Sequence, residues 1–276
     1  MKFGQFLIRI VSDGNFWLDG GAMFGVVPKV LWNKLNPADD QNRIKLALNC
    51  LLIDTGNKKV LIDTGVGEKL SEKFKGIYRV ERDNGLLSSL RSAGVEPEDI
   101  DFVINTHLHF DHCGGNTRVI DKKLTTTFPR AKYVIQKKEW FDATHPNERT
   151  RASYLPENFI PIEERGQLIL VEGDTEILPG INVILTNGHT AGHQSVLIQS
   201  EDRTAIYFGD LVPTTSHLKI PYIMGYDLFP LDIIEKKKEV LEKAMKQQWL
   251  LIFEHDPKNP FGYLKEVERK PVFQPI

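Results

Sequence analysis

The sequence predicts an α/β domain in which paired β-sheets lie inside and helices lie outside. Short apolar runs separated by turn residues recur along the chain, which is typical of sheet strands. Amphipathic segments such as 231–247 carry apolar residues at helical spacing along one side. No repeat, low-complexity tract or change of composition divides the 276 residues, so we expect one domain over 1–276.

The N-terminal part predicts three strands and a covering loop. Residues 1–11 form an apolar run that ends at the turn signal Ser12-Asp13-Gly14-Asn15. Residues 16–43 are aromatic but aperiodic, which predicts an ordered loop folded over another part of the protein. Residues 44–53 and 59–62 then form a predicted hairpin.

The middle of the chain predicts alternating helices and strands. Leucines at helical spacing predict a helix over 84–93, with Asp83 or Asn84 as its N-cap. Residues 145–165 contain three prolines and predict a second covering segment. The other expected elements here are a strand over 101–104, a helix from Gly115 to about Ile120, a strand over 132–136 and a helix over 137–144.

The C-terminal part predicts two hairpins, a third covering loop, one long helix and a last buried strand. The first hairpin is broken by Leu178-Pro179-Gly180. The lysines of residues 236–246 are expected to form a solvated face of the helix. The elements are the strands 167–171 and 181–186, the strands 194–199 and 203–208, the loop 209–230, the helix 231–247 and the strand 249–253.

Composition and charge exclude several classes of protein. A net charge of −2 leaves no basic footprint, so nucleic acid is not an expected partner. The two cysteines cannot build a disulfide framework and suit a reducing compartment. The N-terminus lacks the apolar core of a signal peptide, and no apolar run approaches the length of a membrane span. We therefore expect a cytoplasmic protein without a membrane partner.

The densest chemical signal directly follows the predicted strand 101–104 and is the stretch Asn105-Thr106-His107-Leu108-His109-Phe110-Asp111-His112-Cys113-Gly114-Gly115-Asn116. Side chains alternate in an extended chain, so His107 and His109 point to one side and can share an ion. Asp111 and His112 are adjacent and point apart, so the stretch can also supply ligands to a second ion. The glycine pair lets the backbone turn tightly away. The alternative is a histidine-rich surface loop.

Three further candidate ligands lie in loops directly after predicted strands. They are His189 in Gly188-His189-Thr190-Ala191-Gly192-His193, Asp210 after Phe208-Gly209, and His255 after Glu254. Loops at strand ends are where a layered scaffold gathers its functional groups. Each histidine taken alone could instead be a hydrogen-bonded structural residue. Together with the motif above, the set supplies five histidines and two aspartates, which suits two divalent ions.

This joint pattern is similar to that of the metallo-β-lactamase fold superfamily of metallohydrolases. Residues 107–112 match the HxHxDH motif of the family. The later ligand motifs of the family match, in order, His189, Asp210 and His255. Asp63 in Ile62-Asp63-Thr64-Gly65 matches an early aspartate that supports the site from behind the ligands. The resemblance spans roughly residues 44–257 and implies a four-layer αββα sandwich.

The resemblance also implies a role for each residue. One ion would be held by His107, His109 and His189, and the other by Asp111, His112 and His255. Asp210 would bridge the two ions. Hydroxide between the ions would be the nucleophile, because each cation stabilises the anion, and one ion would polarise the attacked oxygen. Asp111 could pass a proton to the leaving group. The donor types suit two zinc ions, with iron, manganese and cobalt as alternatives.

Other polar residues near the motifs have competing interpretations. Cys113 adjoins the motif but has no place in the complete ligand set, so we expect a small, partly buried thiol. His193 is expected to form a hydrogen bond behind the ligands. His217 lies in the loop after Asp210, where it either contacts substrate or is structural.

Within the superfamily, the sequence resembles the N-acyl-homoserine lactonases and their organophosphate-hydrolysing relatives of the methyl parathion hydrolase type. The resemblance lies in residues 107–116, 188–195 and 210–218. The best-known lactonases carry a tyrosine three residues after the bridging aspartate, where it assists the substrate carbonyl, but here that position is Pro213. The candidate replacements are Tyr222, Thr214 and His217.

An apolar substrate needs an apolar wall, and the covering loops supply candidates for it. The candidates are Phe24, Val26, Val27, Trp32, Phe110, Ile223 and Met224. Alternatively, these side chains pack the loops onto the core or form a dimer contact, and residues 16–43 could serve as a dimerisation arm.

The sequence thus predicts a dinuclear metallohydrolase that opens lactone esters, with N-acyl-homoserine lactones as the first candidates. Hydrolysis of organophosphates or aryl esters by the same fold is one alternative, because a fold hosts many reactions. A non-catalytic ligand-binding sensor is the other alternative, although the complete ligand set argues against it.

Overall fold

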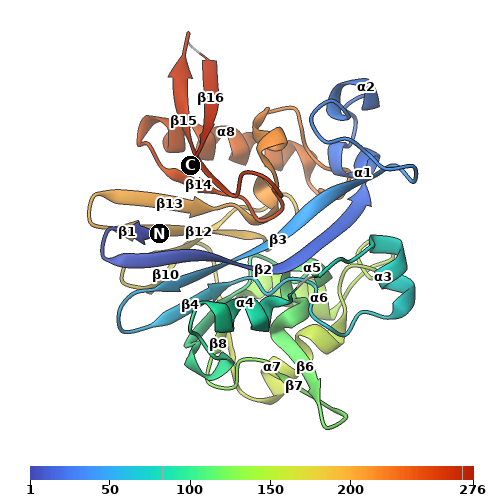
Figure 1. Ribbon diagram of the computed structural model, residues 1–276, viewed down its shortest axis with the longest axis vertical. Helices are drawn as coiled ribbons and strands as arrows, with labels where there is room; N and C mark the ends of the chain where they lie inside the picture. The colour runs from blue at the N-terminus through green and yellow to red at the C-terminus, as the bar shows by residue number, and fades with distance from the viewer. Residues whose placement is uncertain (83, 269) are drawn as a thin grey trace.

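The computed structural model describes residues 1–82, 84–268 and 270–276, and Figure 1 shows two sheets packed face to face between outer helices. Three helices, α4 (Leu86–Ser92), α6 (Lys137–Thr144) and α7 (Ile160–Glu164), pack on the first sheet. The long helix α8 (Pro230–Lys246) packs on the second. The predicted four-layer αββα sandwich is confirmed.

The first sheet combines an antiparallel N-terminal half with a parallel second half. Strands β1 to β4 pair antiparallel, and β4, β5, β8 and β9 pair parallel. The order along the sheet is β1 (Lys2–Phe3), β2 (Phe6–Asp19), β3 (Arg43–Asp54), β4 (Lys59–Ile62), β5 (Phe102–Ile104), β8 (Lys132–Gln136) and β9 (Leu168–Val171).

The second sheet follows the order of the chain. Its strands pair antiparallel except for β13 and β14, which are parallel because α8 connects them. The strands are β10 (Thr175–Leu178), β11 (Ile181–Leu185), β12 (Gln194–Ser200), β13 (Arg203–Tyr207), β14 (Leu250–Ile252), β15 (Phe261–Val267) and β16 (Lys270–Pro275).

The remaining elements are short. Among them, β6 and β7 form a small separate hairpin. They are α1 (Gly20–Phe24), α2 (Lys29–Trp32), α3 (Glu72–Tyr78), α5 (Phe110–Cys113), β6 (Thr117–Ile120), β7 (Lys123–Thr126), and the 3-10 turns η1 (Pro97–Asp99), η2 (Gly114–Asn116), η3 (Pro156–Asn158), η4 (Gly209–Leu211) and η5 (Thr215–Leu218).

The core between the sheets explains the near-continuous apolar runs in the sequence. Ile53, Ile62 and Ile104 of the first sheet meet Val196 and Ile252 of the second in one buried cluster. A strand covered on both faces has no solvated side, so its sequence need not alternate. The loops that leave these buried strands are therefore held on a rigid frame.

The predicted turn at residues 12–15 is wrong, because β2 continues through it with a bulge between Ser12 and Asn15. Asp13 is buried in that bulge, where its carboxylate accepts hydrogen bonds from Gly67 N and Leu86 N at 3.0 Å each. Asp13 thereby caps helix α4, whose N-cap residue is Gly85 rather than the predicted Asn84. The other candidate cap, Asp83, lies outside the described residues.

Two further predictions of local structure are wrong. The helix predicted up to Ile120 is strand β6, whose β-branched residues pair with β7. Residues 168–171 do not form a hairpin with 181–185, because β9 joins the first sheet and β10 is the true partner of β11. The chain between β10 and β11 turns through Gly180, which has a φ of 82°. The C-terminal hairpin of β15 and β16 was not predicted at all.

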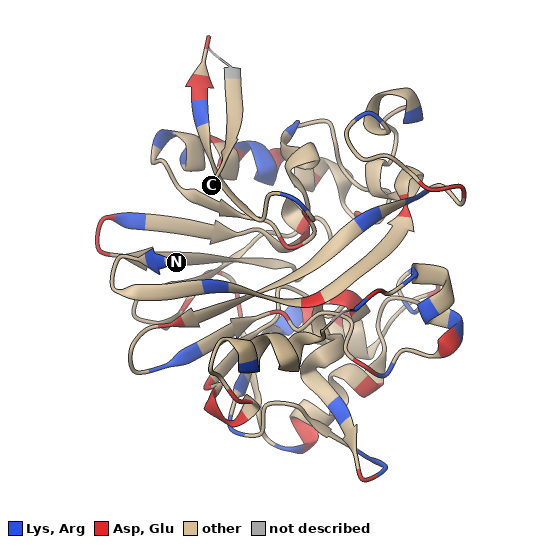
Figure 2. Cartoon of the chain, in the orientation of Figure 1, with Lys and Arg blue, Asp and Glu red and all other residues tan. Residues whose placement is uncertain are grey.

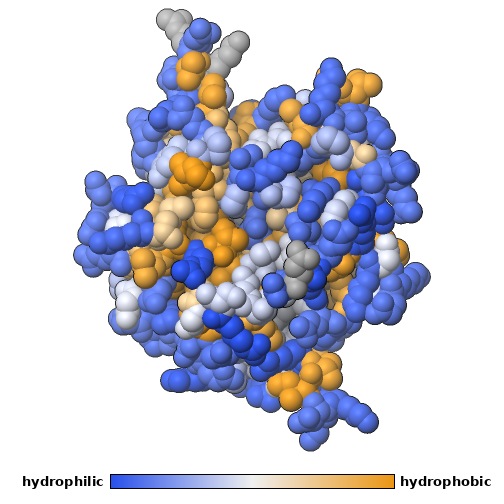
Figure 3. Space-filling view, viewed as in Figure 1, coloured by the Kyte–Doolittle hydropathy of each residue, from blue (hydrophilic) through white to orange (hydrophobic). Residues whose placement is uncertain are grey.

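The surface carries both charges interspersed, and Figure 2 shows no extended block of either sign on this face. Apolar side chains project at two corners in Figure 3, over α2 and over the β6–β7 hairpin. At these corners Val30 is 71% exposed and Val119 is 59% exposed. Within the described ranges, no helix is both long enough and apolar enough to cross a membrane.

Candidate metal centre

The candidate ligands gather at one edge of the sandwich because each follows a strand that ends there. The ligand candidates and Asp63 each follow the end of a strand within a few residues: Asp63 follows β4, His107 follows β5, His189 follows β11, Asp210 follows β13 and His255 follows β14. Strands of both sheets therefore contribute, and residues nearly 200 positions apart in the chain become neighbours. The side chains of these residues are buried.

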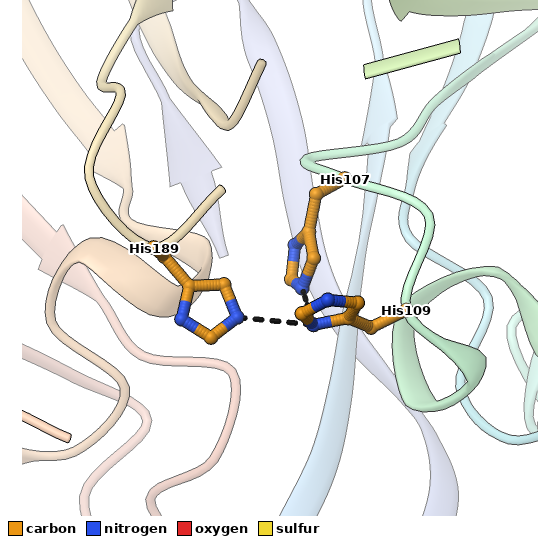
Figure 4. A group of neighbouring side chains, drawn as sticks. All are labelled: His107, His109 and His189. Atoms are coloured by element: carbon orange, nitrogen blue, oxygen red, sulfur yellow. Dashed lines mark hydrogen bonds between the residues drawn. The ribbon is translucent and has the colours of Figure 1, made fainter. Parts of the chain in front are cut away.

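Three histidines form the first group of converging donor atoms. His107 Nε2 lies 3.0 Å from His109 Nδ1, and His189 Nε2 lies 3.0 Å from the same His109 atom. Figure 4 shows the three imidazoles turned toward one another, two from the loop after β5 and one from the loop after β11. The expectation that His107 and His109 face the same side agrees with this geometry.

Asp111, His112 and His255 form a second group. His112 Nε2 lies 3.1 Å from His255 Nε2, while Asp111 Oδ2 lies 3.7 Å and 3.8 Å from those two atoms. The prediction that Asp111 and His112 point apart is wrong, because the chain does not stay extended after His109. It enters the helical turn α5, which directs both side chains to the same point.

Asp210 lies between the two groups and approaches donor atoms of both. Its Oδ2 is 3.1 Å from His189 Nε2 and 3.5 Å from His112 Nε2, and its Oδ1 is 3.2 Å from His255 Nε2. Although burial alone would raise the pKa of Asp210, His112, His189 and His255 hold it well below its usual value. The side chain is therefore a buried carboxylate anion.

Gly209 makes this placement of Asp210 possible. It has a φ of 55°, and a Cβ atom there would lie 2.8 Å from His193 Nε2 and 2.8 Å from a Thr106 side-chain atom. Any other residue would both strain the backbone and collide with the site. The backbone N–H of Asp210 donates to His193 Nε2 at 3.0 Å, and burial lowers the pKa of His193 to about 3. His193 is thus a neutral acceptor behind Asp210.

Two buried carboxylates lie on the far side of His112. Asp63, at a φ of 54° that is uncommon for a residue with a side chain, accepts from Thr106 N at 2.7 Å and lies 3.1 Å from His112 Nδ1. Glu254 Oε2 lies 2.8 Å from the same nitrogen. Burial and the nearby Asp63 raise the pKa of Glu254 to about 8. Sequence reasoning identified Asp63 but missed Glu254, although it directly precedes His255.

Other imidazoles are oriented by partners on their outer nitrogens. His189 Nδ1 lies 2.9 Å from Asp227 Oδ1, and His255 Nδ1 lies 2.8 Å from the carbonyl oxygen of Ala47. Such outer partners fix the ring orientation and the tautomer of a ligating histidine. Asp227 was also missed as a site residue, because nothing in its local sequence links it to a histidine 38 positions earlier.

Glu139 ties the two histidine loops together. Its fully buried carboxylate accepts hydrogen bonds from Leu108 N at 2.9 Å, Tyr154 OH at 2.9 Å and Thr190 Oγ1 at 2.5 Å. One side chain of α6 thereby joins the loop of His107 and His109 to the loop of His189. Sequence periodicity places Glu139 on a helix but cannot show that it faces inward.

The donor set fits divalent metal ions. Donor atoms bound to one zinc ion at 2.0–2.1 Å in a tetrahedron lie roughly 3.3 Å apart, close to the nitrogen separations of the first group. Asp210 Oδ1 is buried and has no hydrogen-bond partner among the described residues, although His255 Nε2 is near. A buried carboxylate oxygen without a hydrogen bond is costly unless a cation satisfies it. Both predicted three-residue groups can hold an ion by the proximity of their donor atoms.

A cavity of about 270 Å³ opens onto both groups. Its wall includes Phe110 and Met224 among the predicted substrate contacts, together with Tyr78, Tyr226 and Arg149. Tyr226 lies in the predicted covering loop 209–230, whereas Tyr78 lies on α3, for which no site residue was predicted. The cavity therefore has hydroxyl groups on its wall, although Pro213 replaces the expected tyrosine.

Four predicted substrate contacts do not line this cavity within the described part of the chain: Phe24, Thr214, His217 and Tyr222. His217 is buried, with Nδ1 2.8 Å from Thr214 Oγ1 and Nε2 2.8 Å from the carbonyl oxygen of Met23. Phe24 stacks on the His217 ring with centroids 4.6 Å apart. These residues pack the covering loops together, which was the competing interpretation.

Known proteins resemble this chain over most of its length. The family model of the metallo-beta-lactamase superfamily matches residues 44–255. The chain belongs to this superfamily. A curated N-acyl homoserine lactonase from a Bacillus species is 30% identical over 227 residues, covering 77% of this chain and 82% of that protein. The lactonase AttM from Rhizobium radiobacter is 24% identical over 256 residues, covering 88% and 92%.

Solved structures share the fold of this metallo-beta-lactamase superfamily hydrolase. A probable metal-dependent hydrolase from Staphylococcus aureus is 33% identical, with a TM-score of 0.93 over 100% of this chain and 99% of that one. The dizinc quorum-quenching lactonase AidC, at 21% identity and a TM-score of 0.79 over 100% and 96%, shares the fold.

One lysine of this hydrolase contradicts the predicted solvated face of α8. Lys237 is fully buried, and its ammonium donates to the carbonyl oxygens of His217 at 2.9 Å, Lys219 at 3.1 Å and Tyr222 at 2.7 Å. Burial lowers the pKa of Lys237 to about 7. The loop before Met224 is thus fastened to the long helix by a single side chain.

Proposed function

We propose that the protein is a dinuclear metallohydrolase that opens lactone esters, with N-acyl-homoserine lactones as its substrates. The observation that carries the proposal is the position of the Asp210 carboxylate, which lies 3.1 Å from His189 Nε2 in the first group and 3.2 Å from His255 Nε2 in the second. The curated relatives that are called N-acyl homoserine lactonases, at 30% identity, support the choice of substrate. On such substrates the activity would be quorum quenching.

The two groups of donors would hold one ion each, His107, His109 and His189 the first, and Asp111, His112 and His255 the second. Two divalent ions, zinc in the simplest case, would lower the pKa of a water between them and polarise the lactone carbonyl. Asp210 would serve both ions, and its negative charge reduces their mutual repulsion. The pKa of His107 is held well below its usual value by burial and by the neighbouring imidazoles, so this ring is already neutral and ready to bind a cation.

The other residues of the chain orient and protect this arrangement. Asp227 and the Ala47 carbonyl fix the rings of His189 and His255, and Asp63 fixes the loop of His107 through Thr106. Met224 and Phe110 present apolar surface beside the donors, which keeps bulk water away from the bond that is cleaved.

Asp111 is the candidate proton donor for the leaving group. Asp111 lines the cavity. Its Oδ2 lies 3.7 Å from His112 Nε2, which is farther than the 3.1 Å between the two histidine nitrogens of the same group. Opening a lactone releases an alkoxide that must take up a proton before the product leaves. A carboxylate at the edge of the donor group can carry that proton from water to the alkoxide oxygen.

Two measurements test the proposal. Metal analysis of the purified protein should give about two ions per chain, and less than one would favour a non-catalytic sensor. A side-by-side assay should then compare long- and short-chain acyl-homoserine lactones with paraoxon and an aryl ester. We expect the lactones to be hydrolysed fastest, and a phosphotriester rate far above every lactone rate would overturn the ranking.

A further inference from the structure

The metal-facing cavity adjoins a second, larger cavity. The second has a volume of about 490 Å³, and its wall includes the apolar side chains of Val26, Ile223 and Pro230. The two cavities share four wall residues, Arg149, Met224, Gly225 and Leu228. The second cavity therefore lies directly beside the first, across these four residues.

Arg149 is the one lysine or arginine among the described residues that line either cavity. Its Nη2 atom donates to the carbonyl oxygens of Gly225 at 2.9 Å and Asp227 at 3.5 Å, which places the guanidinium at the junction. The carboxylate of Asp227 does not neutralise it, because Oδ1 faces His189 Nδ1 and Oδ2 accepts from Met224 N at 2.8 Å. Arg149 forms no ion pair with any described residue, so most of its five N–H donors are available.

We infer that Arg149 is a specificity-determining residue that donates a hydrogen bond to the amide carbonyl of an N-acyl lactone. The inference rests on the proposed function and adds to it the part of the substrate that is recognised. An N-acyl-homoserine lactone consists, in order, of a lactone ring, an amide and an apolar chain. The site presents the same order, with the donor groups first, Arg149 at the junction and the apolar second cavity beyond.

This arrangement distinguishes substrates that carry an amide from those that do not. A simple alkyl lactone has the ring and the apolar chain but offers no carbonyl at the junction. A charged donor that is aimed at a carbonyl raises affinity about 10- to 100-fold relative to a ligand without that acceptor. Arg149 should thus favour N-acyl lactones over alkyl lactones, aryl esters and phosphotriesters.

The test compares two lactones on the metal-loaded, full-length protein. The substrates are N-hexanoyl-homoserine lactone and a γ-alkyl lactone with a chain of similar length. We expect Arg149→Met to reduce kcat/KM for the acyl-homoserine lactone about 10- to 100-fold, mainly through KM, and to change the alkyl lactone less than about threefold. Calorimetry with the ring-opened product N-hexanoyl-homoserine should show the same loss of affinity without turnover.

Two variants serve as controls. Arg151→Met removes another exposed arginine two residues away that lines neither cavity, and it should leave hydrolysis of both substrates unchanged. Arg149→Lys retains a charged donor and should recover part of the loss for the acyl-homoserine lactone alone.

The outcomes separate this inference from the proposed function. Equal losses on both lactones would mean that Arg149 only supports the loop of Gly225, and this would overturn the inference, as would no loss on either. A wild-type protein that hydrolyses neither lactone would overturn the proposed function and the inference with it.

Discussion

The loops of the candidate ligands and the wall of the cavity differ in what holds them in place. Each ligand loop continues a buried strand and is fastened by main-chain hydrogen bonds. Thr64 N donates to His112 O at 2.8 Å, and Ala47 N donates to His255 O at 3.1 Å. Such bonds do not depend on the side chain at the position. The buried carboxylates of Asp63 and Glu139 add side-chain hydrogen bonds to the loops of His107 and His189.

The part of the wall formed by residues 20–35, 147–154 and 215–230 depends on side chains that reach across the sequence. The His217 ring joins η5 to the carbonyl of Met23, and Arg149 joins the 147–154 segment to Gly225. Lys237 fastens the loop of residues 217–222 to α8. The wall is therefore changed by single substitutions that leave the sheets intact.

The ligand loops and the cavity wall therefore have different roles. A frame of strands and main-chain bonds holds the chemistry in a fixed geometry, while the side-chain contacts of the wall set the shape of the cavity. Substitutions in the two regions should accordingly affect different measurements, metal content in the first and cavity shape or loop order in the second.

The largest effect is expected at the frame. Asp210→Asn removes the charge that lies between the two groups, and we expect metal content to fall and hydrolysis to drop at least about 100-fold, since even the loss of an outer partner costs about 10- to 100-fold. Metal analysis and a lactone assay measure these effects, with the exposed Asp202→Asn as the control. Full activity with two ions bound would show that Asp210 does not bridge.

At the wall, Lys237→Met should lower the free energy of unfolding by roughly 2–3 kcal/mol, because three carbonyl oxygens lose their shared hydrogen-bond donor. Denaturant titration against the exposed Lys238→Met, whose ammonium pairs only with Glu235 among described residues, measures the difference. Hydrogen exchange should also increase in residues 217–224 and remain unchanged in the ligand loops. Equal stability of the two variants would contradict the role of Lys237.

The effect of Lys237→Met should also depend on pH. Burial lowers the pKa of Lys237 in the folded protein to about 7 from its ordinary 10.5. Between these values the unfolded chain binds a proton that the folded chain has lost, so wild-type stability gains with rising pH relative to the variant. We expect the gap between them to widen by roughly 2 kcal/mol from pH 7 to pH 9. A stability difference that narrows with rising pH would show that folding raises the pKa of Lys237 instead of lowering it.

A smaller effect should arise where the wall meets the frame. Asp227 accepts from both His189 Nδ1 and Met224 N, and Asn can accept only one of these hydrogen bonds. We expect Asp227→Asn to weaken metal binding about 10-fold, measured by competition with a chelator. The exposed Asp232→Asn should have no effect. Unchanged affinity in Asp227→Asn would mean that the orientation of His189 is set by the frame alone.

The smallest effect is expected at the outer edge of the wall. Val30 is 71% exposed on α2, so Val30→Ser should alter the free energy of unfolding by less than about 0.5 kcal/mol. Denaturant titration at two protein concentrations measures it. Destabilisation that grows on dilution would instead identify α2 as a contact between copies, as expected for a dimerisation arm.

The sequence determined the frame and the candidate ligands because both are local signals. Continuous apolar runs predicted the buried strands, and His107 and His109 were expected to face the same side from their spacing alone. A ligand directly after a strand needs no knowledge of distant residues to be recognised. The errors occurred where the backbone departs from the simplest pattern, as in the bulge of Asp13.

Only the tertiary structure decided which polar side chains lie behind the ligands and which line the cavity. Glu254, Asp227 and Lys237 are ordinary acidic and basic residues in the sequence, and their burial results from contacts with segments far away in the chain. The pairing of β9 with β8 rather than with β11 depends in the same way on long-range packing. Such contacts have no local periodicity, because they are created only when the two sheets close on each other.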